Sequence, residues 1–303
     1  MQSLRKIEAT VLNSIMKKLL FIKRSNGAHW VGDGFPVRNI FSYNDIHEEM
    51  APFLMLDYAG PTRFEPTQDK RGVGEHPHRG FETVSIVYAG EVSHRDSTGA
   101  GGTIGPGDVQ WMTAASGIVH EEFHSPDYAA RGGAFEMIQL WVNLPAKDKM
   151  APPGYQGITQ AQIPQVALAH DAGLVRVIAG DYEGTQGPAH SFSPINLWDV
   201  RVQAQKPVRF TLPAGHTTAL FVLRGAIKLS RGETVREAEL AVMEREGEEM
   251  AFEALQDTTL LLLSGQPLNE PIVGYGPFVM NSEAEIRQAM GDYRSGLMGH
   301  IAS

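Results

Sequence analysis

The segment HPHRGFETVSIVYAGEV, residues 76–92, joins a histidine pair, an apolar run and a glycine turn. Side chains two residues apart on a β-strand point to the same face, so His76 and His78 are expected to face one way. If the alternation continues, Val84, Ile86 and Tyr88 share that face. The segment therefore predicts a strand with two imidazoles at its mouth above an apolar floor, which is how a small β-barrel would present a metal pocket.

A second segment, SGIVHEEFHSP at residues 116–126, shows the same alternation. His120, Glu122 and His124 fall on one face of the predicted strand. If this strand lies opposite the first across a barrel, three imidazoles and one carboxylate converge, and such a set suits a divalent first-row metal with open positions. We expect Fe(II) first, and Mn, Ni, Cu and Zn remain alternatives because the affinity order alone does not select among them.

A single histidine pair is a weak signal, because histidines also occur on surfaces and in hydrogen-bonded cores. Two pairs that share a strand face are a stronger one. His124 is expected to support the metal site from behind or to replace one of its ligands. The other histidines are not paired with one another in the sequence, and most are predicted to be structural: His29, His47, His94, His170, His190, His216 and His300.

The composition excludes several classes of site and partner. None of the 303 residues is cysteine, which rules out disulfide scaffolds, thiol catalysis and iron–sulfur clusters and leaves His, Asp and Glu as metal ligands. The net charge of −9 argues against binding to a nucleic-acid backbone but not against a protein partner. No apolar run approaches the ~20 residues of a membrane span and no signal peptide is recognisable, so we expect a cytoplasmic protein with no membrane contact.

The chain pattern predicts many short strands in two domains. The chain contains 32 glycines and 18 prolines, a content that favours short strands joined by turns. A Pro- and Gly-rich connector at 152–157 suggests a boundary between domains 1–151 and 152–303. Strands are expected at 199–204, 207–212, 219–229 and 257–265. A strand followed by a glycine turn occurs at both Gly90 and Gly225, which suggests a duplicated β domain.

Both chain ends carry helical patterns. Near the C-terminus, Ser282 and Glu285 form a capping box before a helix that would place Ile286, Met290 and Tyr293 on one face, with Gly296 as its stop. Residues 1–15 are either an amphipathic extension helix or an appended segment.

Four strings resemble the pirin family, a group of two-domain cupins, in the family's order: HPHRGFETVSIVYAGEV, GPGDVQWMTAASGIVHEEF, MIQLWVNLP and GPFVMN. The resemblance runs from about Val31 to about Met290 and implies an all-β bicupin, with two tandem antiparallel β-barrel or jelly-roll domains and a short C-terminal helix. The sequence departs from the wider cupin pattern at three places. Ala115 stands where that pattern has Pro, His124 where it has Asn, and Gly90 comes one residue late.

The resemblance also implies a ligand set. Pirins resemble one another in using a Glu two residues after the second motif's His, so His76, His78, His120 and Glu122 are carried over as ligands. Glu82, which matches the metal-binding Glu of most cupins, becomes a supporting or structural carboxylate. Pirin-like proteins typically hold iron, here one per chain. The C-terminal domain is expected to be a degenerate cupin without metal, since His216 is unpaired and 243–255 contains no histidine.

Two functions follow from the resemblance. Bacterial pirins resemble quercetin 2,3-dioxygenases, which cleave a flavonol with O2; Glu122 would then be the catalytic base, and Arg79 and Gln110 are candidates for orienting the substrate. Other pirins are iron-dependent partners of transcription regulators or metabolic enzymes, and this chain would then bind a protein without catalysis.

Overall fold

The computed structural model describes residues 16–25 and 27–301, so the segment 1–15 lies outside the described residues. The described chain divides into two compact units. Of the described residues, we call those within 25–164, 187–194 and 268–301 the histidine unit, and those within 16–24, 165–186 and 195–267 the apolar unit.

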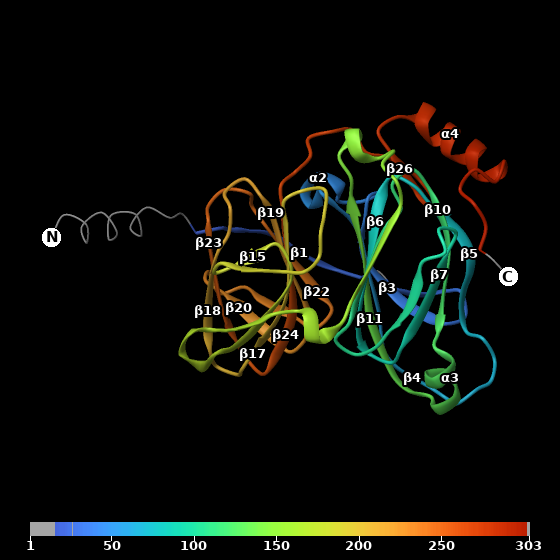
Figure 1. The fold of residues 1–303 in the computed structure, drawn as a ribbon. Helices are drawn as coiled ribbons and strands as arrows, with labels where there is room; N and C mark the ends of the chain where they lie inside the picture. Colours follow the sequence, from blue (N-terminus) through green and yellow to red (C-terminus); the bar gives the residue numbers. More distant parts are fainter. Residues whose placement is uncertain (1–15, 26, 302–303) are drawn as a thin grey trace. The chain divides into compact units, whose positions relative to one another are not determined.

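The histidine unit contains two antiparallel sheets (Figure 1). The larger has the order β12-β9-β6-β11-β4-β3-β2 and the smaller the order β5-β10-β7-β8. The larger sheet is formed by β2 (Ala28–Val31), β3 (Phe35–Ser42), β4 (Phe53–Phe64), β6 (Phe81–Ala89), β9 (Val109–Thr113), β11 (Gly133–Asn143) and β12 (Gly154–Ile158). The smaller is formed by β5 (Gly72–His78), β7 (Val92–Asp96), β8 (Gly101–Ile104) and β10 (Ile118–His124). A hairpin and short helices complete this unit: β25 (Val273–Tyr275), β26 (Phe278–Met280), α2 (His47–Met50), α3 (Pro126–Arg131), α4 (Glu283–Arg294), η1 (Ala146–Asp148) and η2 (Gln160–Gln162).

The apolar unit repeats this plan with the orders β1-β22-β19-β24-β17-β14-β13 and β18-β23-β20-β21. Its larger sheet is formed by β1 (Leu19–Arg24), β13 (Gln165–Ala167), β14 (Gly173–Ala179), β17 (Ile195–Val202), β19 (Thr217–Arg224), β22 (Glu239–Met243) and β24 (Thr258–Gly265). Its remaining elements are β15 (Asp181–Tyr182), β16 (Thr185–Gln186), β18 (Pro207–Thr211), β20 (Ala226–Leu229), β21 (Thr234–Arg236), β23 (Glu249–Ala254) and η3 (Ala169–Asp171).

The predicted duplication corresponds to these matching sheet orders. β6 and β19 occupy equivalent central places, and each ends at a glycine of positive φ, 85° at Gly90 and 92° at Gly225. A side chain at such a φ is strained, so glycine permits the turn into β7 and β20. The expected strand 219–229 is therefore two strands. The fold prediction, two tandem antiparallel β domains with a short C-terminal helix, is confirmed.

The units are not contiguous in sequence, unlike the expected domains 1–151 and 152–303. β1, near the start of the chain, pairs with β22 in the apolar unit, whereas β12, which follows the Pro- and Gly-rich connector, pairs with β9 in the histidine unit. Residues 268–301 also belong to the histidine unit. Each larger sheet is thus completed by an edge strand from the other half of the chain, a non-local pairing that composition does not reveal.

The C-terminal helix α4 begins and ends as the sequence predicts (Figure 1). The Ser282 hydroxyl accepts a hydrogen bond from the Glu285 amide at 3.3 Å, and the Glu285 carboxylate accepts one from the Asn281 amide at 3.1 Å. Ile286 is buried on the predicted face, while Tyr293 remains 40% exposed. The helix packs in a cluster of apolar side chains that holds it against β26 and β10: Val119, Phe278, Met280, Ile286, Ala289 and Met298.

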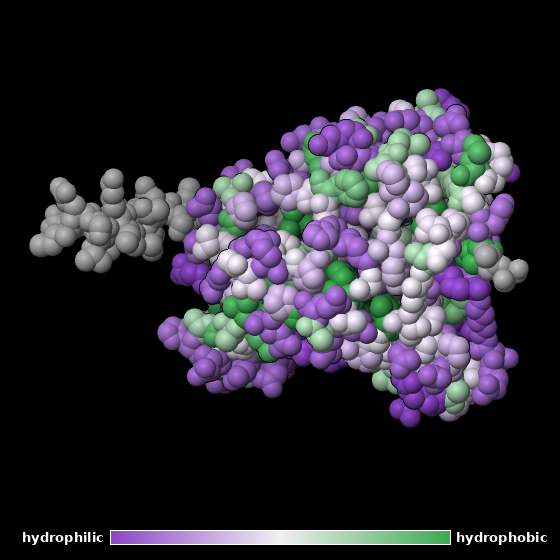
Figure 2. All heavy atoms as spheres, viewed as in Figure 1, coloured by the Kyte–Doolittle hydropathy of each residue, from purple (hydrophilic) through white to green (hydrophobic). Residues whose placement is uncertain are grey.

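The surface is mainly polar on the face drawn in Figure 2, where hydrophobic residues form small, separate patches. Among the described residues, no helix is both long and apolar enough to cross a membrane.

Candidate metal centre

Three imidazoles come together where β5 and β10 pair. His120 is the cross-strand partner of His76, and Ile118 is the partner of His78. The ring centroids of His76 and His120 are 4.2 Å apart, and each of these rings is 4.9 Å from that of His78. The nitrogens that could act as ligands all lie within 4.8 Å of one another. The structure therefore brings together the three histidines that the sequence singles out.

Hydrogen bonds fix how two of these rings are protonated. Nδ1 of His76 lies 2.8 Å from the Gly74 carbonyl oxygen, and Nδ1 of His78 lies 3.4 Å from that of Pro277. A carbonyl oxygen only accepts, so each Nδ1 carries the hydrogen and donates it. The lone pair of each ring is then on Nε2, the arrangement in which a carbonyl behind the ring orients a metal ligand.

His120 provides the test of whether the site fits a metal. Its Nε2 is buried and has no hydrogen-bond partner among the described residues. A buried nitrogen without a partner is unfavourable, and a metal ion would satisfy it. Burial, reinforced by the charge of His76, holds the pKa of His120 well below its usual range, and burial does the same to the pKa of His78. Both rings are therefore neutral, the form that binds metals.

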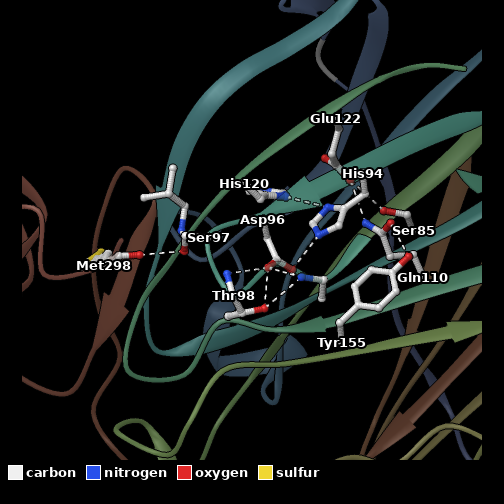
Figure 3. A network of polar contacts seen from close by, with 12 residues as sticks. Ser85, His94, Asp96, Ser97, Thr98, Gln110, His120, Glu122, Tyr155 and Met298 are labelled. Atoms are coloured by element: carbon white, nitrogen blue, oxygen red, sulfur yellow. Dashed lines mark hydrogen bonds and ion pairs between the residues drawn. The ribbon is translucent and has the colours of Figure 1, made fainter. Parts of the chain in front are cut away.

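Behind His120 lies a hydrogen-bonded chain that the sequence analysis missed (Figure 3). Nδ1 of His120 is 3.2 Å from Nδ1 of His94, and Nε2 of His94 is 3.1 Å from Oδ2 of Asp96. Although burial opposes it, hydrogen bonds from His94 and Thr98 lower the pKa of Asp96, so this carboxylate is ionised and accepts from His94 Nε2. The contact with His94 uses Nδ1 of His120, which leaves Nε2 of His120 available to a metal.

The missed residues carried one signal in the sequence. His94 and Asp96 are two residues apart on β7, directly before the glycine-rich turn, and they are the cross-strand partners of Glu122 and His120. Directly opposite residues of an antiparallel pair share a face. The register that places them beside the ligands is not visible in the sequence.

Glu122 completes the candidate ligand set. Its side chain lines the same cavity as those of His76 and His78, and its carboxylate lies within 4.8 Å of ligand nitrogens of His94 and His120. Oε1 accepts a hydrogen bond of 3.2 Å from Nε2 of Gln110, whose own Oε1 accepts one of 3.3 Å from the Tyr155 hydroxyl (Figure 3). Gln110 therefore orients Glu122, a different task from the substrate contact we expected.

Arg79 lies away from the cavity, so the expected substrate contact is not seen. Its backbone pairs with that of Phe278, and Gly80 turns the chain directly after it with a φ of 91°. Nε of the guanidinium donates a hydrogen bond of 2.6 Å to the Ser116 carbonyl oxygen, and Nη1 donates one of 2.7 Å to the Asp292 carboxylate. Arg79 thus joins the histidine strand to the C-terminal helix.

His124 and Glu82 also have structural surroundings. His124 shares the strand face of His120 but lies among aromatic rings, with Phe64 at 4.6 Å between centroids and Nε2 at 2.9 Å from the Gly34 carbonyl oxygen. Glu82 accepts hydrogen bonds of 2.7 Å from Thr113 and 3.2 Å from Ser191, and burial raises its pKa to about 7. Neither residue belongs to the groups of candidate ligand atoms among the described residues.

The expected continuation of the histidine face into Val84, Ile86 and Tyr88 is wrong. β5 ends at His78 and β6 begins at Phe81, so the alternation restarts after the turn at Gly80. The Phe81 ring lies 5.2 Å from the His78 ring, and the Ser85 hydroxyl is 3.4 Å from Oε1 of Glu122. The odd-numbered residues of β6 therefore face the site.

A cavity of about 350 Å³ reaches the candidate ligands. His76, His78 and Glu122 form part of its wall, and Asp57 and Gln139 contribute further polar groups. The rest of the wall is apolar and includes Phe35, Val37, Met55, Val73, Met137 and Trp141. An apolar cavity with a few convergent polar groups is typical of a site for a small organic molecule.

Within the described residues, both groups of candidate metal ligands lie in the histidine unit. Strands β18 and β23 of the apolar unit correspond in sheet order to β5 and β10, and in this pair Phe210 lies opposite Met250. Both side chains belong to the large apolar cluster of this unit.

Family models and similar sequences all relate this chain to the pirin family. The Pirin family model matches residues 34–142, and the model of the pirin C-terminal cupin domain matches residues 197–299. A protein of Pseudomonas aeruginosa that is provisionally named quercetin 2,3-dioxygenase is 58% identical over 281 residues, which cover 93% of this chain and 98% of that protein. A pirin-like protein of Caulobacter vibrioides is 39% identical over 251 residues, which cover 81% and 86%.

Solved structures agree with this result. The crystal structure of a quercetin 2,3-dioxygenase from Acinetobacter baumannii superposes with a TM-score of 0.93 at 52% identity and covers 95% of this chain and 100% of that one. A bacterial pirin from Escherichia coli in complex with nickel(II) shares the fold, with a TM-score of 0.63 at 18% identity over 82% of this chain and 99% of that one. The chain is therefore a two-domain cupin and belongs to the pirin family.

Proposed function

We propose that this pirin is a mononuclear iron enzyme that cleaves flavonols of the quercetin type with O2. One observation carries the proposal: three imidazoles form one group of candidate ligands, and two of them, His76 and His78, lie with Glu122 in the wall of a largely apolar cavity. The names of the Pseudomonas and Acinetobacter relatives support the same activity. Three histidines and one glutamate are a donor set that would suit iron and other divalent first-row metals.

His76, His78 and His120 would hold the metal through Nε2, and Glu122 would hold it through its carboxylate. Bound iron would supply Lewis acidity toward a substrate hydroxyl and one-electron chemistry toward O2. Every other part of the reaction that we propose uses the chain's own residues.

Glu122 would also act as the base. Its carboxylate would take the proton of the flavonol 3-hydroxyl as the substrate enters, while the amide of Gln110 holds Oε1 in place at 3.2 Å. The apolar side chains of the cavity, among them Trp141, would pack against the flavonol rings and exclude water. The products are a ring-opened ester that contains both oxygen atoms of O2, and carbon monoxide.

The test is anaerobic reconstitution with Fe(II), followed by quercetin and O2. We expect loss of the flavonol absorbance, with one carbon monoxide formed per flavonol consumed. Glu122→Gln should abolish turnover. Glu75→Gln, which changes an exposed carboxylate on the same strand as His76 and His78, should leave it intact.

If iron-loaded wild-type protein consumes no quercetin and forms no carbon monoxide, the proposal fails. The alternative is then an iron-dependent regulatory protein that binds a transcription factor or a metabolic enzyme.

A further inference from the structure

A row of four polar side chains crosses the larger sheet of the histidine unit, and two of them, Asp57 and Gln139, line the cavity. Asn39 on β3 is the cross-strand partner of Asp57 on β4, Asp57 is the partner of Gln139 on β11, and Gln139 is the partner of Ser85 on β6. Directly opposite residues of antiparallel strands share a face, so these four side chains form one line across the sheet.

The line is unusual because its surroundings are apolar. Met55 and Ala59 flank Asp57 on β4, and Met137 and Trp141 flank Gln139 on β11; all four line the cavity. Asp57 is 8% exposed. A donor or acceptor that has no protein partner in such a place is available to a ligand that enters the cavity.

Two polar groups in this row have no hydrogen-bond partner among the described residues. Asn39 donates a hydrogen bond of 2.7 Å to Oδ1 of Asp57, and no described residue donates one to Oδ2. Ser85 donates a hydrogen bond of 2.6 Å to Oε1 of Gln139, and the side-chain nitrogen of Gln139 has no acceptor among the described residues. A carboxylate acceptor and an amide donor thus lie on neighbouring strands of the cavity floor, and a hydroxyl group can pair with both at once.

The distance between this pair and the candidate ligand Glu122 indicates the length of a ligand that could contact both. Ser85 lies 3.4 Å from Glu122, while Asp57 is two strands away from Ser85 across the sheet. Two strand spacings are about 10 Å. A ligand that reaches from Glu122 to Asp57 is therefore an extended molecule with a polar group at each end.

We infer that Asp57 and Gln139 form a hydroxyl-recognition subsite, so that the cavity selects aromatic substrates with a phenolic hydroxyl remote from the oxygen that meets the metal. The hydroxyl donates to Oδ2 of Asp57 and accepts from the amide of Gln139. This inference rests on the proposed function and narrows its substrate class.

The experiment measures binding, without O2, to the iron-loaded protein. Quercetin carries hydroxyls on its pendant ring, and galangin is the flavonol that lacks them. A hydrogen bond to a charged group contributes about 1.5–3 kcal/mol, so wild-type protein should bind quercetin about tenfold or more tightly than galangin. In Asp57→Asn and in Gln139→Met this preference should fall to about twofold or less. Asp69→Asn, on an exposed loop outside the cavity, should keep it.

Galangin affinity shows whether each variant still has an intact cavity, and it should stay close to wild type. If wild-type protein binds the two flavonols equally, or if the preference survives in both variants, the subsite is disproved while flavonol cleavage stands. If neither flavonol binds and none is turned over, the proposed function itself fails, and the subsite fails with it.

Discussion

His94 and His120 meet through their Nδ1 atoms at 3.2 Å, and Nε2 of His94 continues the contact to Asp96 at 3.1 Å (Figure 3). Asp96 is itself held, because its Oδ1 accepts hydrogen bonds from the Thr98 amide at 2.8 Å and the Thr98 hydroxyl at 2.6 Å. A buried carboxylate therefore sets the orientation of a candidate metal ligand through a second imidazole. Partners of this kind fix the tautomer of the ligand and raise its basicity.

Removing the acceptor for His120 should weaken metal binding. His94→Leu leaves Nδ1 of His120 without a partner, and the loss of such an outer contact typically lowers metal affinity 10–100-fold. His94→Asn retains an oxygen acceptor close to the position of Nδ1 and should lose less. The measurement is Fe(II) or Co(II) affinity by anaerobic competition with a chelating dye.

His190→Leu serves as the matched control, because the His190 side chain is exposed and its hydrogen bonds to Gln156 come from its backbone. Wild-type affinity in both His94 variants would show that the chain behind His120 does not support the metal.

The ligand assignment predicts one metal per chain. His120 belongs to both groups of candidate ligand atoms, so His120→Ala should reduce bound iron by an order of magnitude or more. Glu122→Gln replaces an anionic ligand with a neutral amide and should also lower the iron content. Metal analysis after gel filtration measures both. Full metal content in both variants would refute the assignment, and about two metals per wild-type chain would refute a metal-free apolar unit.

Arg79 should matter for stability and not for substrate affinity. Its guanidinium is buried against Asp292 at 2.7 Å, and breaking a buried pair by removing one partner commonly costs about 3–5 kcal/mol. Arg79→Leu should therefore lower the urea midpoint of unfolding markedly, with KM for the flavonol unchanged. Arg287→Leu is the control. It removes an exposed cation that pairs with Glu283 on α4, the helix of Asp292, and it should have little effect on stability. A raised KM with unchanged stability would restore the predicted substrate role.

The sequence predicted those features that depend on local spacing. His76 and His78 share a strand face because residues two apart always do, and the capping box at Ser282 begins α4 as expected. The glycine turns at Gly90 and Gly225 exposed the duplication. Each of these signals spans only a few residues.

What the sequence did not predict depends on register and on distant pairing. His94 lies beside His120 only because β7 and β10 pair in one register, and the match of β1 with β22 joins residues that are over 200 apart in the sequence. Arg79, next to His78 in the sequence, is a candidate for orienting the substrate, yet its guanidinium donates a hydrogen bond to Asp292. A strand alternation cannot be extended through a turn.

Glu82 should make the stability of the protein depend on pH. Burial raises its pKa from the ordinary 4.5 to about 7, although hydrogen bonds from Thr113 and Ser191 oppose the rise. Between these two values the folded protein binds more protons at this site than the unfolded chain, so the stabilisation is complete below about pH 4.5 and is lost as the pH rises through 7. The difference corresponds to about 3 kcal/mol.

Glu82→Gln keeps the shape of the side chain and removes its titration. In metal-free protein, the free energy of unfolding of the wild type, relative to that of the variant, should therefore fall by about 3 kcal/mol between pH 4 and pH 8. Urea unfolding at a series of pH values measures both proteins, and the titration of His78 and His120 is common to them and cancels. Parallel curves for the two proteins would show that the Glu82 carboxyl has an ordinary pKa. Its burial against Thr113 and Ser191 would then be balanced by those hydrogen bonds alone.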